Sequence, residues 1–402
     1  MNKCLLIGSA LLLAAACRES EPSVRSAGPS SHGITGDIYA DTRAGNLSPV
    51  ASRAQPLVYV PNSKGNTVSV IDPARYVVVR TFDTGKLPQH VVPSYDLATL
   101  WVANDNGNSL TPINPLTGRD STRVAVDDPY NLYFTPDGKF ALVIAERLHR
   151  VDVRDAHTMK FIQSIRVDCR GIDHMEFTAD GQYGIATCEF SGQLVKINLA
   201  TRKVVGTLSL APGAPFWTPL TRSVKHFFSR GRHAIEFNKG SMPQDIRSSP
   251  DGRMFYVADM RAGGVVLIDP VKLQRTGFIK TGIGTHGLYP SRDGKKLYIT
   301  NRGWTTPSGG RHGPGSISVL DFSTNKVIAT WGIPGGGSPD MGNVSADGKE
   351  LWISGRYDDE VYVFDTSSGK LTHRIPVGRE PHGLTVWPQP GRYSLGHTGN
   401  MR

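Results

Sequence analysis

The chain has 402 residues, with 44 glycines and 27 prolines against 20% charged residues, a composition typical of many short strands joined by turns. Its formal net charge is +10 at pH 7. After the N-terminal leader no apolar run approaches the roughly 18 residues of a membrane span, which excludes transmembrane helices from the body of the protein.

The first element is an apolar stretch, residues 5–16, which follows Lys3 and is typical of a signal peptide. It ends in Leu-Ala-Ala-Ala-Cys and so resembles a bacterial lipoprotein signal, in which the cysteine, here Cys17, becomes the acylated first residue. Ordinary cleavage after Ala16 is the alternative. We expect residues 1–17 to form the signal and 18–56 a flexible tether, with the protein exported and lipid-anchored at the periplasmic or outer cell surface.

A repeat begins after the tether. An apolar-aromatic-apolar motif recurs at intervals of 42, 42, 42, 71, 42 and 54 residues, so that a constant spacing of 42 is broken by two insertions, of 29 and 12 residues. The seven copies centre on Tyr59, Trp101, Val143, Ile185, Tyr256, Tyr298 and Trp352. Each copy holds four β-like runs, and a period near 42 with four strands predicts a propeller blade. We therefore expect an all-β, seven-bladed β-propeller with four antiparallel strands per blade over residues 57–388.

Two short patterns support the repeat. Five copies carry an Asp-Gly pair that suits a tight hairpin, at residues 137–138, 180–181, 251–252, 293–294 and 347–348. Another run reads LVYVPN, LWVAN or LYITN, ending at Asn62, Asn104 and Asn301. This pattern resembles the YVTN-repeat propellers, which include the YncE group, over nearly the whole mature domain. The resemblance implies a bacterial exported protein and, through the YncE group, an association with single-stranded DNA.

The two ends of the repeat are predicted to share a blade. The first copy begins at its second strand and lacks an inner one, whereas residues 381–387, after the last complete copy, supply one more inner-strand motif. This C-terminal strand is expected to complete blade one and leave no open edge. Residues 389–402 would then be a C-terminal tail.

Both insertions are predicted to emerge on the face opposite the Asp-Gly turns, residues 211–243 between blades four and five and residues 302–315 within blade six. The first is rich in aromatic residues and carries five basic residues against one acidic residue. Such a loop suits an anionic ligand, and its candidate contacts are Trp217, Arg222, Arg230 and Arg232. The alternative is that its aromatic residues simply pack on the propeller mouth.

Polar residues recur just before each inner strand on the same face. Equivalent positions hold Gln89, Tyr130, Asp173, Gln244, His286, Asp340 and His382, and the next positions add His90, Asn131, His174 and Asp245. These residues are candidate ligand contacts around the channel opening. Two histidines and a carboxylate in three consecutive blades, His286, Asp340 and His382, also form a candidate site for a first-row transition metal. A hydrated polar ring without metal is the alternative.

The two cysteines of the body, Cys169 and Cys188, fall in one copy on this face, and export makes a disulfide between them plausible. The sequence contains no nucleophile elbow, P-loop, zinc-protease helix or haem-attachment motif. We favour a monomeric binding or scaffold protein for an anionic small molecule, polysaccharide or protein partner over an enzyme. A metal- or cofactor-dependent periplasmic enzyme and a nucleic-acid-binding propeller are the alternatives.

The lipid anchor is tested by replacing its attachment residue. Cys17→Ser removes the only thiol that the signal motif presents for acylation, so the protein should move from the membrane fraction to the soluble exported fraction. Cell fractionation with immunodetection measures this. A membrane fraction unchanged in Cys17→Ser would contradict lipidation at this residue.

Overall fold

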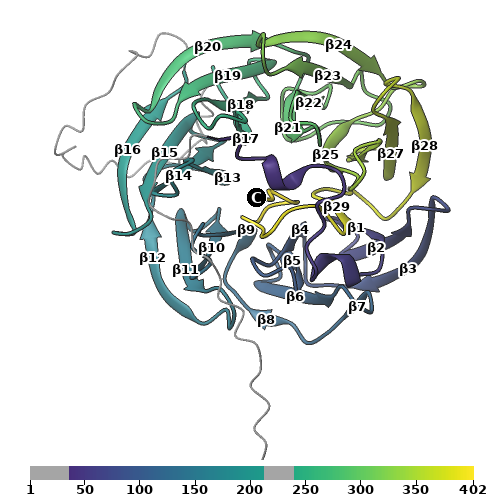
Figure 1. Ribbon diagram of the computed structural model, residues 1–402, viewed down its shortest axis with the longest axis horizontal. Helices are drawn as coiled ribbons and strands as arrows, with labels where there is room; N and C mark the ends of the chain where they lie inside the picture. Colours follow the sequence, from purple (N-terminus) through teal and green to yellow (C-terminus); the bar gives the residue numbers. More distant parts are fainter. Residues whose placement is uncertain (1–35, 212–239) are drawn as a thin grey trace, which may run out of the picture. The chain divides into compact units, whose positions relative to one another are not determined.

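The computed structural model describes residues 36–211 and 240–402, which all belong to one compact unit, Ser31–Arg402. Seven antiparallel sheets are arranged around a central channel (Figure 1). The helices of the described residues are two short 3-10 turns, η1 (Ala40–Thr42) and η2 (Ala51–Arg53). No helix in that part of the chain has the length and apolar character needed to cross a membrane.

Each sheet is one blade, and its innermost strand comes first. Blade one is β29 (Thr385–Trp387), β1 (Leu57–Asn62), β2 (Thr67–Asp72) and β3 (Val77–Asp83); blade two is β4 (Pro88–Pro93), β5 (Leu100–Asn104), β6 (Ser109–Asn114), β7 (Arg119–Asp120) and β8 (Val124–Ala125); blade three is β9 (Pro129–Phe134), β10 (Phe140–Ala145), β11 (Arg150–Asp155) and β12 (Phe161–Arg166); blade four is β13 (Ile172–Phe177), β14 (Tyr183–Cys188), β15 (Gln193–Asn198) and β16 (Lys203–Ser209).

The remaining blades follow the same order. Blade five is β17 (Pro243–Ser248), β18 (Phe255–Asp259), β19 (Gly264–Asp269) and β20 (Gln274–Lys280); blade six is β21 (Thr285–Pro290), β22 (Lys296–Asn301), β23 (Ser316–Asp321) and β24 (Lys326–Gly332); blade seven is β25 (Pro339–Val344), β26 (Glu350–Gly355), β27 (Glu360–Asp365) and β28 (Leu371–Pro376). The predicted seven-bladed propeller is confirmed. In blade two alone the outer strand is split, since β7 and β8 both pair with β6.

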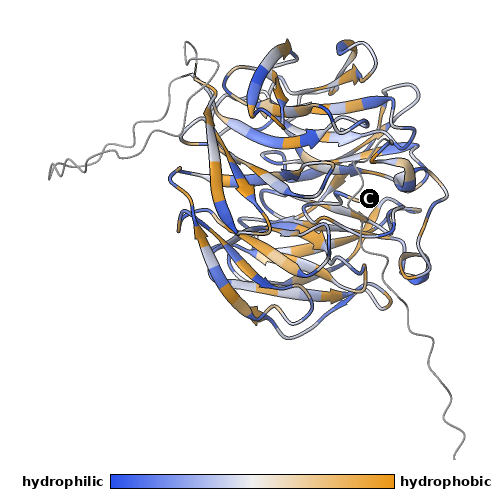
Figure 2. Ribbon diagram, turned by 60° about the vertical axis from the view of Figure 1, so that its left-hand side comes forward, coloured by the Kyte–Doolittle hydropathy of each residue, from blue (hydrophilic) through white to orange (hydrophobic). Residues whose placement is uncertain are grey.

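Burial falls from the channel outward. The innermost strands β4, β9, β13, β17 and β25 are buried at every residue, whereas the outermost strand β24 alternates between exposed and half-buried residues. Figure 2 shows the matching hydropathy, with apolar and polar segments alternating along the strands. An inner strand is covered on both faces by neighbouring blades, and only the outer strand borders solvent.

The Asp-Gly turns are held by a recurring side-chain bond. In all five, the hydroxyl of a serine or threonine two residues before the aspartate donates to its Oδ1 at 2.5–2.7 Å. The following glycine has a positive φ, between 62° and 78°, which a residue with a Cβ rarely adopts. These two features explain why the turn sequence is repeated so closely.

The core is divided among the blade interfaces. Seven clusters of buried apolar side chains are present among the described residues, and each draws on two adjacent blades. Each blade is therefore stabilised by both neighbours, and the ring has to close for the first and last blades to be covered.

The predicted closing strand is confirmed. β29 pairs antiparallel with β1, with Leu57 opposite Trp387 and Tyr59 opposite Thr385. Leu384 and Val386 pack with Val361 of blade seven, and Trp387 is buried against blade two. One three-residue strand thus joins the end of the chain to both of its neighbouring interfaces.

Both chain ends differ from the sequence-based expectation. Residues 36–56, expected to be tether, pack on the Asp-Gly face: Tyr39 is buried, and its hydroxyl donates to the carbonyl of Ser248 at 2.9 Å. The tail 389–402 lies at the centre of the ring on the same face (Figure 1). The signal and residues 18–35, including Cys17, lie outside the described residues.

Loss of the closing side chain should weaken the fold. Trp387→Ala removes a side chain that is 1% exposed, and truncation of a buried tryptophan costs about 3–5 kcal/mol of unfolding free energy. Denaturant unfolding measures this loss. Val271→Ala, at a residue 79% exposed, is the control and should stay within about 0.5 kcal/mol of the wild type. Equal stability of the two variants would show that the ring does not depend on β29.

Candidate functional site

A β-bulge positions the polar ring at the mouth of the channel. In blades two to seven the pairing of the innermost strand with the next strand shifts register at the mouth, for example between Ile172 and Met175 of β13. A bulge leaves an extra residue unpaired and turns its side chain. Consecutive residues such as Asp173 and His174 can therefore both reach the channel, where regular alternation would direct one of them into a blade interface.

The structure gathers the predicted ring residues at one opening. All seven are at most 8% exposed: Gln89, Tyr130, Asp173, Gln244, His286, Asp340 and His382. His382 Nδ1 lies 3.0 Å from the carbonyl oxygen of Gln89 and its Nε2 lies 3.4 Å from Asp340 Oδ2. The ring therefore forms a continuous polar rim across blades rather than separate sites.

Two arginines occupy the basic side of this rim. Arg302 donates to Asp340 Oδ1 from Nε at 2.9 Å, and its Nη2 donates to His286 Nε2. Arg356 donates from Nη1 to the other carboxylate oxygen at 3.2 Å. Burial opposes ionisation of Asp340, but Arg302 and the neighbouring histidines hold the pKa of this carboxyl well below its usual range. Asp340 is thus a carboxylate shared by two guanidiniums.

This network argues against the predicted metal set. One ligand atom each from His286, Asp340 and His382 lies within 4.8 Å of the others, so the three side chains converge as the sequence predicts. However, Arg302 donates a hydrogen bond to Nε2 of His286, and both carboxylate oxygens of Asp340 accept hydrogen bonds from guanidiniums. A cation placed here would meet two positive charges, so the cluster suits an anion better than a metal ion.

Carboxyl groups line the opposite side of the mouth. Asp173 accepts from Thr187 Oγ1 at 2.6 Å through Oδ1, while its buried Oδ2 has no partner. Burial, and after it the nearby Glu189, raises the pKa of Asp173 well above its ordinary value. The pKa of Glu146 is raised well above its ordinary value by the same two causes. Glu189 is buried and accepts from Gln244 Nε2 at 2.8 Å. Asp173 and Glu146 are therefore neutral at pH values where ordinary carboxyls are charged.

One layer deeper, histidines fill the channel. The rings of His90 and His382 have centroids 4.8 Å apart, and the same distance separates His174 from His397. Burial lowers the pKa of His90 to about 4 and shifts His174 and His397 well below their usual value. These imidazoles are neutral near pH 7. The predicted contact Asp245 lies beside them, with Oδ1 3.7 Å from His397 Nε2 and 2.9 Å from Arg247 Nη1.

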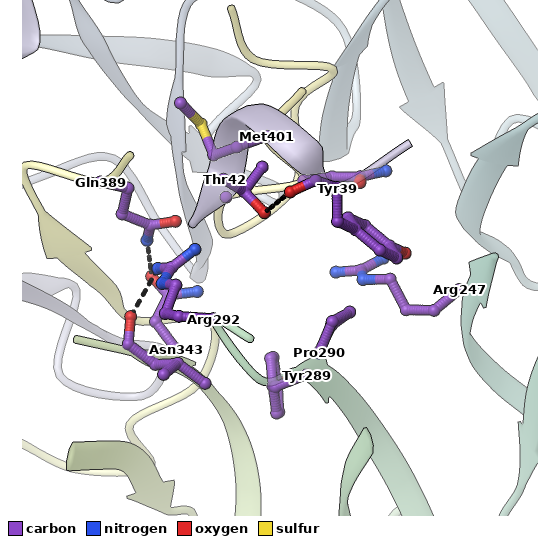
Figure 3. Close-up of a pocket in the computed structure, with 12 residues that line it drawn as sticks. Tyr39, Thr42, Arg247, Tyr289, Pro290, Arg292, Asn343, Gln389 and Met401 are labelled. Carbon is purple, nitrogen blue, oxygen red and sulfur yellow. Dashed lines mark hydrogen bonds between the residues drawn. The ribbon is translucent and has the colours of Figure 1, made fainter. Parts of the chain in front are cut away.

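The C-terminal tail closes the other end of the channel. Leu395 accepts a backbone bond from Phe134 N at 3.0 Å, and Arg402 pairs with the buried Glu176 at 2.9 Å. Figure 3 shows the small cavity left between the tail, η1 and the inner strands, with Arg247 and Gln389 at its wall. Its volume is about 30 Å³, which has room for water but not for a larger ligand. The tail therefore blocks access to the channel interior from the Asp-Gly face.

The insertion at residues 302–315 lies on the opposite face. The Tyr357 hydroxyl donates to the carbonyl of Pro307, and the backbone N–H of His312 donates to Asp358 Oδ1 at 2.7 Å. The insertion therefore packs against the loop that carries Arg356. Most of the other insertion, with the candidates Trp217, Arg222, Arg230 and Arg232, lies outside the described residues.

Cys169 and Cys188 are joined by a disulfide with a Cα–Cα distance of 6.0 Å, as the sequence predicts. The bridge ties the end of β14 to the segment that leads into β13. It lies next to Glu189, so it restrains the acidic side of the mouth.

Several residues of the channel were not predicted from the sequence. Arg302, Arg356, Glu146 and Glu189 each directly follow the second strand of a blade, so the repeat offset used for the ring would have found them one turn further along. His397 has no such signal. Its place in the channel follows from the path of the tail, which the repeat does not describe.

A family model described as "YNCE-like beta-propeller" matches residues 38–205 and 229–390. Among solved structures, a functionally unknown protein from Desulfotomaculum acetoxidans DSM 771 is 14% identical with a TM-score of 0.63, covering 83% of this chain and 100% of its own. Kuenenia stuttgartiensis hydrazine synthase is 19% identical with a TM-score of 0.56, covering 74% and 88%, respectively. The dihydro-heme d1 dehydrogenase NirN in complex with DHE is 15% identical with a TM-score of 0.57, covering 84% and 75%. No curated protein matches the sequence.

The Arg302–Asp340–Arg356 network should be needed for stability. Asp340→Asn keeps the shape of the side chain but leaves two buried guanidiniums without a carboxylate, and such a loss costs about 3–5 kcal/mol. Denaturant unfolding at neutral pH measures it. The control is Asp168→Asn, whose side chain is 97% exposed, and which should change the unfolding free energy by less than about 0.5 kcal/mol. A similarly small change in Asp340→Asn would contradict the assigned charge of Asp340.

Proposed function

The chain belongs to the YNCE-like β-propeller family, and because this fold hosts many functions, we propose from its channel mouth that it is a binding protein for a small anionic molecule. Arg356 is the principal contact in this proposal. In this proposal the protein is exported and lipid-anchored, which the lipoprotein-like leader sequence supports, and its ligand is extracytoplasmic.

The observation that carries the proposal is the unused hydrogen-bonding capacity of Arg356. Among the residues that the structure describes, its side chain makes one hydrogen bond, from Nη1 to Asp340, and its buried Nε has no partner. A guanidinium presents five N–H groups in a planar fork suited to carboxylate or phosphate. Arg302, in contrast, is committed to Asp340 and His286 through Nε and Nη2. Arg356 is thus held in place by Asp340, and its remaining N–H groups can donate to a ligand.

The charge around Arg356 supports an anion. Two guanidiniums against the single carboxylate of Asp340 leave one net positive charge in this cluster. Burial raises the pKa of Asp173 and Glu146, across the mouth, well above the ordinary range, which favours the uncharged form of these two acids. A neutral carboxyl can itself donate a hydrogen bond to an anion.

The surroundings of the mouth add to this preference. The insertion 302–315 packs beside Arg356 and Tyr357 and forms one wall above the opening. The sequence of the other insertion has five basic residues against one acidic residue. Opposite charge on a long loop increases the local concentration of an anionic ligand before it binds.

A cofactor-dependent enzyme is the second candidate. The structural relatives include hydrazine synthase and a dihydro-heme d1 dehydrogenase, but at 15–19% identity they share the fold alone. No geometry at the mouth singles out a nucleophile or a proton-transfer pair, so we propose no reaction. Single-stranded DNA is a polyanion, so a short oligonucleotide is included among the anions tested below.

The proposal is tested with small anions as probes. Inorganic phosphate, citrate and a short single-stranded oligonucleotide are titrated into wild-type protein and Arg356→Gln by calorimetry at low ionic strength. We expect phosphate or citrate to bind the wild type and to lose about 10- to 100-fold affinity in the variant, the range for a hydrogen bond to a charged group. Arg166→Gln, with a side chain 90% exposed, is the control.

Three results would contradict the proposal. The first is a lack of binding of either small anion to the wild type. The second is equal affinity in Arg356→Gln. The third is tight binding of the oligonucleotide alone, which would favour a nucleic-acid-binding propeller in its place.

A further inference from the structure

Three histidines from distant parts of the chain meet inside the channel, below the mouth. His90 lies on β4, His174 on β13 and His397 on the C-terminal tail. One ring nitrogen of each lies within 4.8 Å of one from each of the others. The ring centroids of His90 are 5.6 Å from His174 and 5.2 Å from His397. Three imidazoles thus surround one point of the closed channel.

Each ring leaves a buried nitrogen unused. All three residues are fully buried, yet the Nε2 atoms of His90, His174 and His397 have no hydrogen-bond partner. A buried polar atom without a partner costs free energy, and three in one cluster of rings call for a ligand. Neutral imidazole is a common ligand of metal ions.

The Nδ1 atoms have partners that can orient the rings. His90 Nδ1 lies 3.0 Å from the carbonyl oxygen of Tyr130, so it donates its proton there and leaves the Nε2 lone pair free. Asn131 Nδ2 lies 3.4 Å from His174 Nδ1 and 3.0 Å from His397 Nδ1. Asn131 Oδ1 accepts from the Leu132 N–H at 2.9 Å, so it is the amide nitrogen that faces both rings. Metal-ligating histidines are commonly held by an outer acceptor such as the Tyr130 carbonyl.

The charges near this cluster are already balanced, unlike those at the mouth. Asp245 is paired with Arg247 at 2.9 Å and Glu176 with Arg402 at 2.9 Å. No guanidinium donates to any of the three imidazoles among the described residues, whereas Arg302 donates to His286 in the mouth cluster. A cation is therefore better accommodated by His90, His174 and His397 than by the set that the sequence suggested.

We propose that His90, His174 and His397 form a binding site for a divalent first-row transition metal ion. Three imidazoles suit zinc, copper, nickel or iron, and leave a fourth position for water or a small ligand that enters from the mouth. Ligand nitrogens around a tetrahedral ion at about 2.1 Å stand about 3.4 Å apart, so the rings draw together on binding. The site lies below the anion site, and its existence does not depend on anion binding.

Metal binding at this site would also fasten the C-terminal tail to the channel wall. His397 reaches the channel because residues 394–402 fold back under the blades, and its neighbours bond to the channel wall: Gly396 pairs with Tyr133, and Asn343 donates to the carbonyl of Thr398. A metal bound to His397 ties this segment to β4 and β13. Metal binding should therefore reduce hydrogen exchange of residues 394–402 more than that of the blade strands.

Cobalt(II) is the probe for the test. Protein stripped with EDTA is titrated with Co²⁺ by visible absorption, with the bound metal counted by elemental analysis after gel filtration. We expect one ion per chain and a loss of affinity of at least 100-fold in His397→Ala. Asn131→Ala, which removes the side chain that contacts Nδ1 of His174 and His397, should lose about 10- to 100-fold. His157→Ala, at a histidine whose side chain is 66% exposed, is the matched control and should bind as the wild type does.

His90→Gln is a second variant in case His397→Ala does not fold, and circular dichroism of the metal-free proteins verifies folding. The proposal is overturned if the wild type binds no Co²⁺, or if His397→Ala and His90→Gln both bind it as tightly as the wild type. Binding lost in His286→Gln but kept in His397→Ala would assign the metal to the mouth cluster and would also overturn the proposal. Anion affinity at the mouth, measured separately, leaves each of these results unchanged.

Discussion

The pairing of β29 with β1 is the constraint on which the rest of the structure depends. Every apolar cluster lies between two blades, so a ring left open would expose the faces of the first and last blades. The chain closes the ring with three residues of strand, Thr385–Trp387, added to the inner edge of blade one. Closure creates the channel, and it also brings the chain end to the centre of the molecule.

The channel interior is polar in part because the bulges let consecutive polar residues, such as Asp173 and His174, both reach it. Polar groups removed from water must be paired, neutralised or given a ligand. All three solutions are present: Asp340 is paired with two arginines, Asp173 is neutralised by burial, and the histidines below are neutral with unused nitrogens. The channel is therefore layered, with the Asp340–arginine network at the mouth and the cluster of imidazoles beneath it.

The tail links closure to the proposed metal site. Because β29 is the innermost strand of blade one, residues after Trp387 begin at the channel axis and need only a short path to line it. They return under the blades and pair Arg402 with Glu176, which places His397 between β4 and β13. The same path closes the channel at the Asp-Gly face, whereas Arg356 and the insertion 302–315 lie on the opposite face.

The repeat in the sequence was sufficient to determine the fold, the blade count, the closing strand and the ring of polar residues at the mouth. Spacing along the chain translates directly into position when each unit repeats the one before it. The contacts within the ring were decided by tertiary structure: Arg302 and Arg356 converge on Asp340 from blades six and seven, which makes this carboxylate the shared partner of two arginines. The packing of residues 36–56 and the entry of His397 were likewise invisible in the sequence. Non-repetitive segments at chain ends are placed by contacts with surfaces that exist only after the ring has closed.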